Sequence, residues 1–328
     1  MPFTKDNIEQ TREMYNKYMT GRTIPQLTSD LIDFTETYFN LKQNKNSKAI
    51  IGISTGKDST CLLGILTKAI DPERVICVSM PLHSSKVDSK SIIDVKQETI
   101  DILNHFNIPK ENRIESLILE DDLKLTNHRP LIMAGTLDFE TQNKWDMSKP
   151  ELRNLAARIR MAKLYYLAQI NNARVANTSN QSESVAGWFT KWGDCVGDFF
   201  PFSELTASEV VLVGLELGIP EKWMFKVPDD GLIGTSDEEA LGFTYNQLDE
   251  EIMKLKINQD DLLPVSFEYN LPADMRKRYI DGMHKRFSMY ISYGENGYIP
   301  VFYNTPKIVD QNGLCVFKIN DLNRNHLI

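Results

Sequence analysis

A short β-branched run that leads directly into a glycine- and serine-rich turn limits most strongly how this chain can fold. Residues 49–54 read Ala-Ile-Ile-Gly-Ile-Ser, which is typical of a buried parallel strand. The pattern then repeats, with strands expected at 75–80, 114–119 and 174–177 and helices at 27–42, 58–70, 88–106, 150–171 and 206–217. Alternation of this kind predicts an α/β fold, a doubly wound parallel sheet with helices on both faces. Ligands of such sheets bind beyond the carboxyl ends of the strands.

The turn after the first strand has the character of a phosphate-binding loop. Residues 52–59 read Gly-Ile-Ser-Thr-Gly-Lys-Asp-Ser, between a strand and the start of a helix. The free N–H groups and positive end of that helix favour phosphate, and Gly56 allows a close backbone approach. A lone carboxylate at Asp58 would repel phosphates, so a bridging magnesium ion is expected there. The alternative is a purely structural turn whose Ser and Asp side chains serve only as helix caps.

Composition narrows the class of protein further. The chain has 328 residues, a net charge of −8 and a pI of about 5.3. A chain this acidic, with no long basic run, is a poor non-specific nucleic-acid binder. Neither an 18-residue apolar stretch nor an apolar N-terminal signal region is found, so no membrane association and a cytoplasmic location are expected.

Three further motifs follow the phosphate loop in order. They are residues 154–161 (NLAARIRM), residues 178–201 (from TSNQSE through GWFTKWGD to Asp198 and Pro201) and residues 284–286 (HKR). Together with the loop, which is similar to that of the PP-loop ATP pyrophosphatases, they resemble the NAD synthase family. The resemblance spans roughly residues 28–290, and implies an adenine nucleotide alpha hydrolase-like fold. It also places an N-terminal segment at 1–27, the synthase-like domain at 28–293 and a C-terminal extension at 294–328, with two short strands expected as a β-hairpin.

The resemblance also implies a role for each matching position. ATP, the co-substrate, is expected to contact Gly52, Ile53, Ser54, Thr55, Gly56, Lys57, Asp58, Ser59 and Thr178. Asp58 and Glu183 are expected to hold Mg²⁺. The residues expected to contact deamido-NAD are Arg158, Lys191, Asp198, His284 and Lys285. Asp58, Glu183 and Lys191 form the expected catalytic set. The aromatic residues Trp188, Phe189 and Trp192 suit a pyridine ring, although core or dimer packing of Trp188 and Phe189 is an equal alternative.

The chain departs from the family pattern beside the ATP phosphates. Thr55 stands where the family usually has glycine, Ala207 replaces a lysine after Leu-Thr, and Asp229 replaces a Thr or Ser after Pro228. These changes remove positive charge and add negative charge near a polyanion. We hypothesise that Lys57 supplies the missing charge; the alternative is that Lys57 faces solvent.

The resemblance implies ATP-dependent amidation of deamido-NAD through an acyl-adenylate, with release of AMP and pyrophosphate. Ammonia is the expected nitrogen donor because the synthase portion occupies almost the whole chain. A homodimer is expected, and the stretches 121–148 and 228–239 are expected to cover the site. Two alternatives stay open: a non-catalytic nucleotide-binding or sensing homologue, and a PP-loop adenylating enzyme with another substrate.

Overall fold

Four parallel strands form the central sheet of the protein. The structure is a computed structural model that describes residues 3–19, 21–83, 89–116, 118–119, 150–226, 237–257, 271–282, 285, 298–300 and 316–318. Its sheet has the order β4-β2-β1-β6, with β1 at Lys48–Ile53, β2 at Val75–Ser79, β4 at Arg113–Glu115 and β6 at Ala173–Val175. All three neighbouring pairs are parallel, and Ile50 is level with Ile76 on one side and Val175 on the other. The predicted α/β parallel sheet is confirmed.

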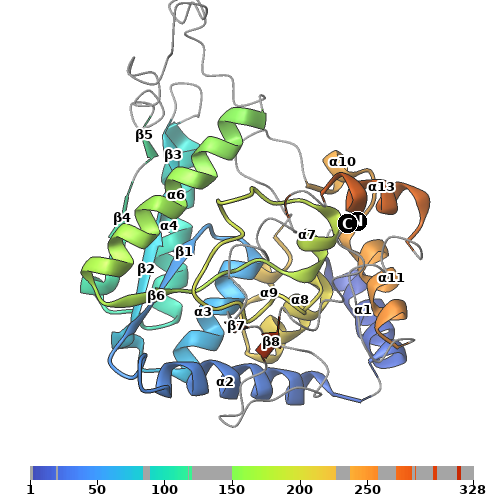
Figure 1. Cartoon of the computed structure of the whole chain (residues 1–328), viewed down its shortest axis with the longest axis horizontal. Helices are drawn as coiled ribbons and strands as arrows, with labels where there is room; N and C mark the ends of the chain where they lie inside the picture. The colour runs from blue at the N-terminus through green and yellow to red at the C-terminus, as the bar shows by residue number, and fades with distance from the viewer. Residues whose placement is uncertain are drawn as a thin grey trace, which may run out of the picture.

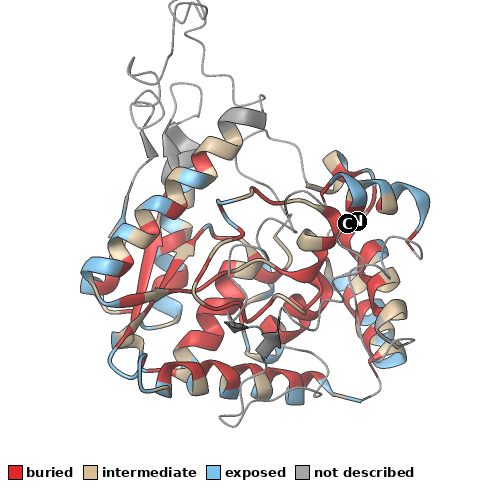
Figure 2. Cartoon of the chain, in the orientation of Figure 1, coloured by how far each residue is buried: buried red, intermediate tan, exposed pale blue. Residues whose placement is uncertain are grey.

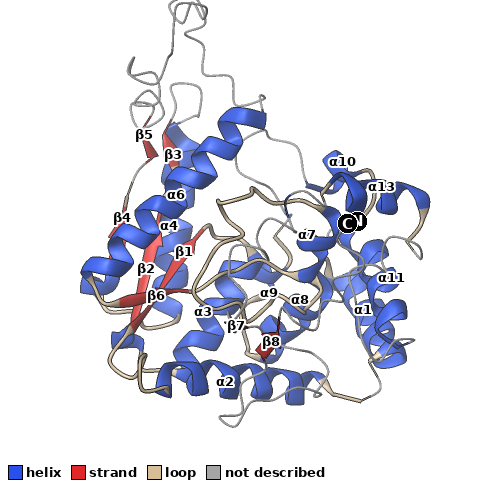
Figure 3. Cartoon of the chain, viewed as in Figure 1, coloured by secondary structure: helices blue, strands red, loops and turns tan. Residues whose placement is uncertain are grey.

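Helices surround this sheet, as Figure 3 shows. In chain order they begin with α1 (Lys5–Tyr18), α2 (Ile24–Asn40), α3 (Lys57–Ala69), α4 (Ser89–His105) and α6 (Pro150–Ile170). The later helices are α7 (Gln181–Ala186), α8 (Ala207–Glu216), α9 (Glu221–Met224), α10 (Asp237–Leu241), α11 (Tyr245–Ile257) and α13 (Ala273–Asp281). Two short 3-10 turns, Pro72–Arg74 and Lys110–Asn112, lead into β2 and β4.

Figure 2 shows the strands of the central sheet as largely buried. Both faces of the sheet are covered because alternate side chains of each strand enter different cores. On one face, Ile51 and Cys77 join a large apolar core with α2, α3 and α8. On the other face, Ile50 and Ile76 pack against Leu164 and its neighbours on α6. Figure 1 shows α6 running along the sheet, with α1 and α11 side by side at the far end of the molecule. The result is the doubly wound arrangement expected from the sequence.

One predicted strand proves to be two. The apolar run 114–119 was expected as a single strand, whereas β4 ends at Glu115 and β5 occupies Ile118–Leu119. β4 pairs with β2 in the main sheet, but β5 pairs in parallel with β3 (Leu82–His83) in a separate two-stranded sheet. An apolar pattern predicts extended backbone without identifying the partner strand, so the division could not be read from it.

The C-terminal extension contributes a second small sheet. β7 (Tyr298–Pro300) and β8 (Val316–Lys318) pair antiparallel, at the two positions where short strands were expected. The proposed division at 27 and 293 stays a prediction. The expected covers at 121–148 and at 228–236 lie outside the described residues. Within the described part of the chain, no helix is both long enough and apolar enough to cross a bilayer.

Candidate active site

The predicted phosphate loop joins the end of β1 to the start of α3. Gly56 is the N-cap of α3 and provides no side-chain cap, so the first turn of this 13-residue helix lacks a side-chain acceptor. Ser54 Oγ accepts a hydrogen bond from the Gly56 N–H at 3.2 Å, and Ser59 Oγ donates to the Gly56 carbonyl at 3.1 Å. The two hydroxyl oxygens lie 3.2 Å apart. These contacts hold the loop with the positive end of α3 directed at the carboxyl edge of the sheet.

Thr55 has an unusual backbone conformation within this loop. Its φ is 63°, in the left-handed region that β-branched residues rarely adopt. The residue is 1% exposed. The strain accounts for why glycine is the residue expected at this position in the family pattern, and it marks the loop as a place where local backbone preference is overridden.

Lys57 does not face solvent, so that alternative is wrong. Its side chain is 4% exposed, and Nζ lies 2.6 Å from Asp58 Oδ2. The ammonium group also lies 5.6 Å from the centre of the Tyr245 ring. Lys57 is therefore a positive charge inside the loop, committed to the carboxylate next to it.

Asn180 connects the two carboxylates that were predicted to share a metal ion. Its Nδ2 donates to Asp58 Oδ1 at 3.0 Å, and its backbone N–H donates to Glu183 Oε2 at 3.2 Å. Asn180 also caps α7, because its Oδ1 accepts the Glu183 N–H at 3.0 Å. Asp58 follows β1 and Glu183 follows β6, and these strands are neighbours in the sheet. The structure thus brings together the predicted pair across adjacent strand ends.

The electrostatics of this cluster show two carboxylates short of positive charge. Burial raises the pKa of Glu183 well above its ordinary value, and the neighbouring Asp58 raises it further, while Lys57 opposes both effects. Burial alone would lower the pKa of Lys57, yet the charges of Asp58 and Glu183 raise it overall. A cation beside this cluster would therefore favour the charged form of Glu183.

Magnesium suits this donor set. Mg²⁺ prefers oxygen ligands and is commonly held by one or two carboxylates together with substrate phosphates, rather than by a complete protein cage. The described residues contain no group of three or more His, Cys, Asp or Glu side chains arranged to hold a metal. Asp58 and Glu183 are the residues that would bind Mg²⁺ beside a phosphate, and a cation there would relieve the repulsion that raises the pKa of Glu183.

Two of the side chains predicted to contact the dinucleotide tie together the loop after α7. Arg158 Nε donates to the Lys191 carbonyl at 3.1 Å. Lys285 Nζ donates to the Gly187 and Phe189 carbonyls at 2.9 and 2.8 Å. His284 lies outside the described residues. Arg158 and Lys285 therefore hold the same loop from two sides, and their predicted substrate contacts stay predictions.

The other predicted residues lie near the end of β6. Asp198 Oδ2 accepts the Val175 N–H at 2.7 Å, so this carboxylate braces the edge strand, and its burial raises its pKa. Thr178 is partly exposed, just past the point where β6 ends. Arg160, two residues from Arg158 on the same helix, contacts a different segment, and its Nε donates to the Met80 carbonyl at 3.1 Å.

The aromatic residues of the second motif divide between core and surface. Trp188 is partly buried against the large core, and Phe189 is buried with Lys285 Nζ 5.3 Å from its ring centre. Trp192 is 46% exposed, and the Lys191 ammonium lies 5.8 Å from its ring centre. Trp192 is thus the aromatic side chain of the three that is most open to a ligand or a partner.

A cation that the sequence did not single out contacts the phosphate loop. Lys226 follows α9, and its Nζ donates to Thr55 Oγ1 at 2.5 Å and to Glu98 Oε2 at 2.6 Å. Ala207, the departure from a family lysine, is fully buried, and its N–H donates to Ser182 Oγ at 2.9 Å. A lone lysine carries no periodic or motif signal, so only the packing of distant segments reveals Lys226.

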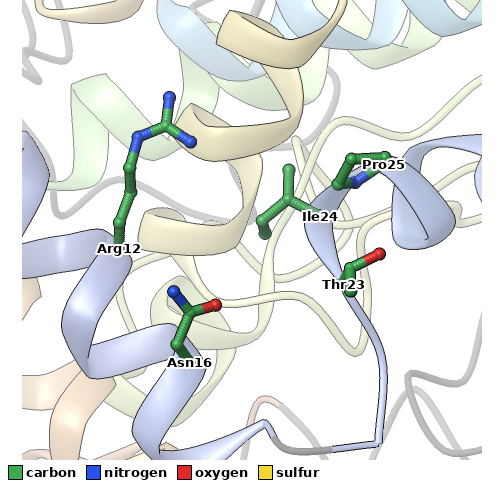
Figure 4. A pocket seen from close by; sticks show the side chains of 5 residues that line it. All are labelled: Arg12, Asn16, Thr23, Ile24 and Pro25. Carbon is green, nitrogen blue, oxygen red and sulfur yellow. The ribbon is translucent and has the colours of Figure 1, made fainter.

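A small hollow elsewhere in the molecule is unrelated to this cluster. It is lined by Arg12, Asn16, Thr23, Ile24 and Pro25, where α1 approaches the start of α2 (Figure 4). These elements carry none of the predicted site residues. The chemistry indicated by the charged side chains is therefore placed at the carboxyl edge of the sheet.

Known proteins are similar to this chain in sequence and in fold. Residues 27–288 match the family described as NAD synthase. The chain is 30% identical over 227 residues to the NH(3)-dependent NAD(+) synthetase of Pyrococcus horikoshii, covering 68% of this chain and 78% of the relative. It is 31% identical over 255 residues to the Pyrococcus furiosus protein of the same name, covering 75% and 88%.

Solved structures show the same architecture. NMN synthetase from Francisella tularensis aligns with a TM-score of 0.58 at 23% identity, covering 81% of this chain and 96% of that one. This likeness extends to the fold, while the sequence matches above extend through the phosphate loop and the motifs that follow it. The chain belongs to the NAD synthase family.

Proposed function

We propose that this protein is an NH₃-dependent NAD synthetase, which uses ATP to convert the carboxylate of deamido-NAD into the amide of NAD. The observation that carries the proposal is the junction of Asp58 and Glu183 through Asn180, beside the phosphate loop, in a member of the NAD synthase family. Relatives named NH(3)-dependent NAD(+) synthetase support ammonia as the nitrogen donor.

ATP would lie on the loop Gly52–Ser59, with Thr178 on the neighbouring strand end. The N-terminus of α3 and the Ser54 and Ser59 hydroxyls would orient its phosphates. Asp58 and Glu183 would hold Mg²⁺, which supplies neutralising charge to the phosphates when it is bound. Deamido-NAD would contact Arg158, Lys191, Asp198, His284 and Lys285. The Arg and Lys cations of this set suit its pyrophosphate and carboxylate.

The chemistry requires activation of a poor electrophile. A nicotinate carboxylate oxygen attacks the α-phosphorus of ATP, forming a C–O–P linkage, while the bond to the bridging oxygen breaks and pyrophosphate leaves. The protein accelerates this step by alignment and charge stabilisation, without a covalent nucleophile of its own. Lys191, near Arg158 and the exposed Trp192 face, is the cation proposed to stabilise charge at the reacting carboxyl group.

Ammonia then attacks the acyl carbon of the adenylate. The new C–N bond forms as the C–O bond to AMP breaks, and a proton is lost from nitrogen to give the amide. Water competes for the same carbon, so a covered site favours amide formation. The stretches 121–148 and 228–239 are proposed to provide that cover.

We further propose that the protein acts as a homodimer in the cytoplasm. Tyr166 and Ile170 lie one turn apart on α6 and are 66% and 61% exposed, so they form an exposed apolar pair on one face of this helix. They fall within residues 152–192, a stretch whose apolar and aromatic content is compatible with a dimer interface. α6 also carries Arg158, so an interface along this helix would border the proposed dinucleotide site.

The test is a turnover assay with purified protein, Mg²⁺, ATP, deamido-NAD and ammonium, in which NAD and AMP are measured together. Equal amounts of both are expected, with little product when glutamine replaces ammonium. Asp58→Asn should lower kcat by about a hundredfold or more, whereas Asp101→Asn, on the exposed face of α4, should leave it unchanged. Binding of deamido-NAD without NAD formation would favour a sensing protein instead. Preference for nicotinate mononucleotide or another carboxylate would assign the same chemistry to a different substrate.

A further inference from the structure

Lys226 is the partly exposed cation that the structure attaches to the phosphate loop. Its side chain is 34% exposed, in contrast to 4% for Lys57. Lys57 is already paired with Asp58 inside the loop. A phosphate arriving from solvent can therefore reach the Lys226 ammonium group without displacing a buried ion pair.

The hydrogen bonds of Lys226 place it where a polyanion would lie. Nζ contacts Thr55 Oγ1, in the middle of the loop between β1 and α3. The ammonium group has three donors, of which two are accounted for by Thr55 and Glu98. The third donor of this partly exposed ammonium group is suited to a phosphate oxygen, whereas the buried Thr55 hydroxyl serves to hold the lysine.

Glu98 balances the charge of Lys226 in the absence of nucleotide. The carboxylate lies on α4, 28% exposed, with Oε2 2.6 Å from Lys226 Nζ. Solvent screens an ion pair at this partly exposed position and weakens it. A triphosphate with several negative charges competes effectively with one carboxylate for the same ammonium group. The pair is thus a weak contact that ATP can replace.

Resting on the proposed function, we infer that Lys226 binds the polyphosphate of ATP and that Glu98 holds this lysine when ATP is absent. Lys226, rather than the buried Lys57, then provides the solvent-facing positive charge that the chain lacks at Ala207. Thr55 contributes to the same phosphate-binding arrangement, because its hydroxyl holds the Lys226 ammonium group against the loop. This assigns a phosphate-binding role to a residue outside all of the sequence motifs.

Substitutions of Lys226 and of Glu98 are expected to have opposite effects on the affinity for ATP. Lys226→Met removes the phosphate contact and should raise the Kd of ATP by tenfold or more, as expected for loss of a charge-assisted hydrogen bond, worth about 1.5–3 kcal/mol at about 1.4 kcal/mol per factor of ten. Glu98→Gln frees the lysine and should lower the Kd of ATP a few-fold. Lys226→Arg should retain most of the affinity. Adenosine, which lacks phosphates, should bind all variants equally.

Calorimetric titration of ATP with Mg²⁺ into each purified variant, without deamido-NAD, provides the measurement. Lys222→Met is the matched control, because Lys222 is exposed on α9 and lies over the Trp223 ring, away from the loop. An unchanged Kd in Lys226→Met, or equal weakening in Lys226→Met and Glu98→Gln, would overturn the inference and leave a structural ion pair. The Kd of ATP is measured without the carboxylate substrate, so it tests the role of Lys226 whichever carboxylate the enzyme uses. Failure of the unaltered protein to form NAD would refute only the proposed function.

Discussion

A buried carboxyl group behind α7 makes the stability of this protein depend on pH. Asp249, on α11, is fully buried, and Oδ2 accepts hydrogen bonds from the Ser208 N–H at 2.7 Å and the Ser208 hydroxyl at 2.6 Å. The Ser182 hydroxyl donates to Oδ1. Ser182 and Ser208 lie in the first turns of α7 and α8. The Asp249 side chain therefore joins α7, α8 and α11 next to Glu183.

The size and sign of the effect follow from the pKa of Asp249. Burial raises this pKa from 3.8 to about 6, even though the hydrogen bonds from Ser182 and Ser208 oppose the shift. A pKa that is higher in the folded state means that folding favours the protonated form. The stability that Asp249 contributes is therefore complete below pH 3.8 and is lost as the pH rises through 6. A shift of about two units corresponds to about 3 kcal/mol of unfolding free energy.

The Asp249→Asn variant isolates this contribution. Its amide cannot ionise, and Nδ2 can donate to Ser182 Oγ while the amide oxygen accepts from Ser208. Guanidinium unfolding of both proteins, at one protein concentration and at several pH values from 4 to 7, gives the difference in unfolding free energy. Part of this contribution is already lost at pH 4, so the difference should change by about 2–2.5 kcal/mol in favour of the variant as the pH rises from 4 to 7. Other buried acids such as Glu183 titrate in both proteins and cancel. A difference that stays constant across this range would refute the assignment.

Three further predictions concern the surroundings of the site. Asn180→Ala should lower the unfolding free energy by about 1–2 kcal/mol, through loss of the α7 cap, and should lower kcat as well; loss of stability with normal kcat would show that the Asp58 contact is dispensable. Gly187→Ala should lower the melting temperature more than Gly218→Ala. Both glycines have positive φ, but a Cβ at 187 would lie 3.0 Å from the Gly282 Cα, whereas a Cβ at 218 would meet no atom within 4 Å. Equal decreases would contradict this steric reason. Tyr166→Glu with Ile170→Glu should convert a dimer into monomers in analytical ultracentrifugation, and an unchanged sedimentation coefficient would place the interface elsewhere.

The phosphate loop and Asp58 were predictable because they follow a strand with a clear apolar pattern, whereas Glu183 was identified through the resemblance to the NAD synthase family. The buried β-branched residues of β1 identify a parallel strand, and the Gly and Ser residues after it identify the turn. The parallel order then places Asp58 and Glu183 at the same sheet edge, because the chain leaves β1 and β6 in the same direction. Local pattern was sufficient for the loop, and the family motif together with sheet geometry placed Glu183 beside it.

Side-chain direction at the start of a helix was not predictable in the same way. Lys57 is the first residue of α3, and the sequence alone does not determine whether a side chain at this position points to solvent or to the core. Its burial depends on Tyr245, which comes from α11 far along the chain and lies beneath its ammonium group. The contact between Lys226 and Thr55 likewise depends on how α9 packs against α3 and α8. Such contacts arise from tertiary packing, to which periodicity is insensitive.

The strained backbone at Thr55 and the position of Lys226 have one explanation. A β-branched residue in the left-handed region is disfavoured by about 1–2 kcal/mol, and glycine there would remove the strain. Glycine would also remove the hydroxyl that holds Lys226, leaving the ammonium group with Glu98 alone and drawn toward α4. The strain is thus tolerable where a cation must be held against the phosphate loop. On this reasoning Thr55 and Ala207 are linked departures, because a chain without a lysine at 207 needs another means of placing positive charge beside the phosphates.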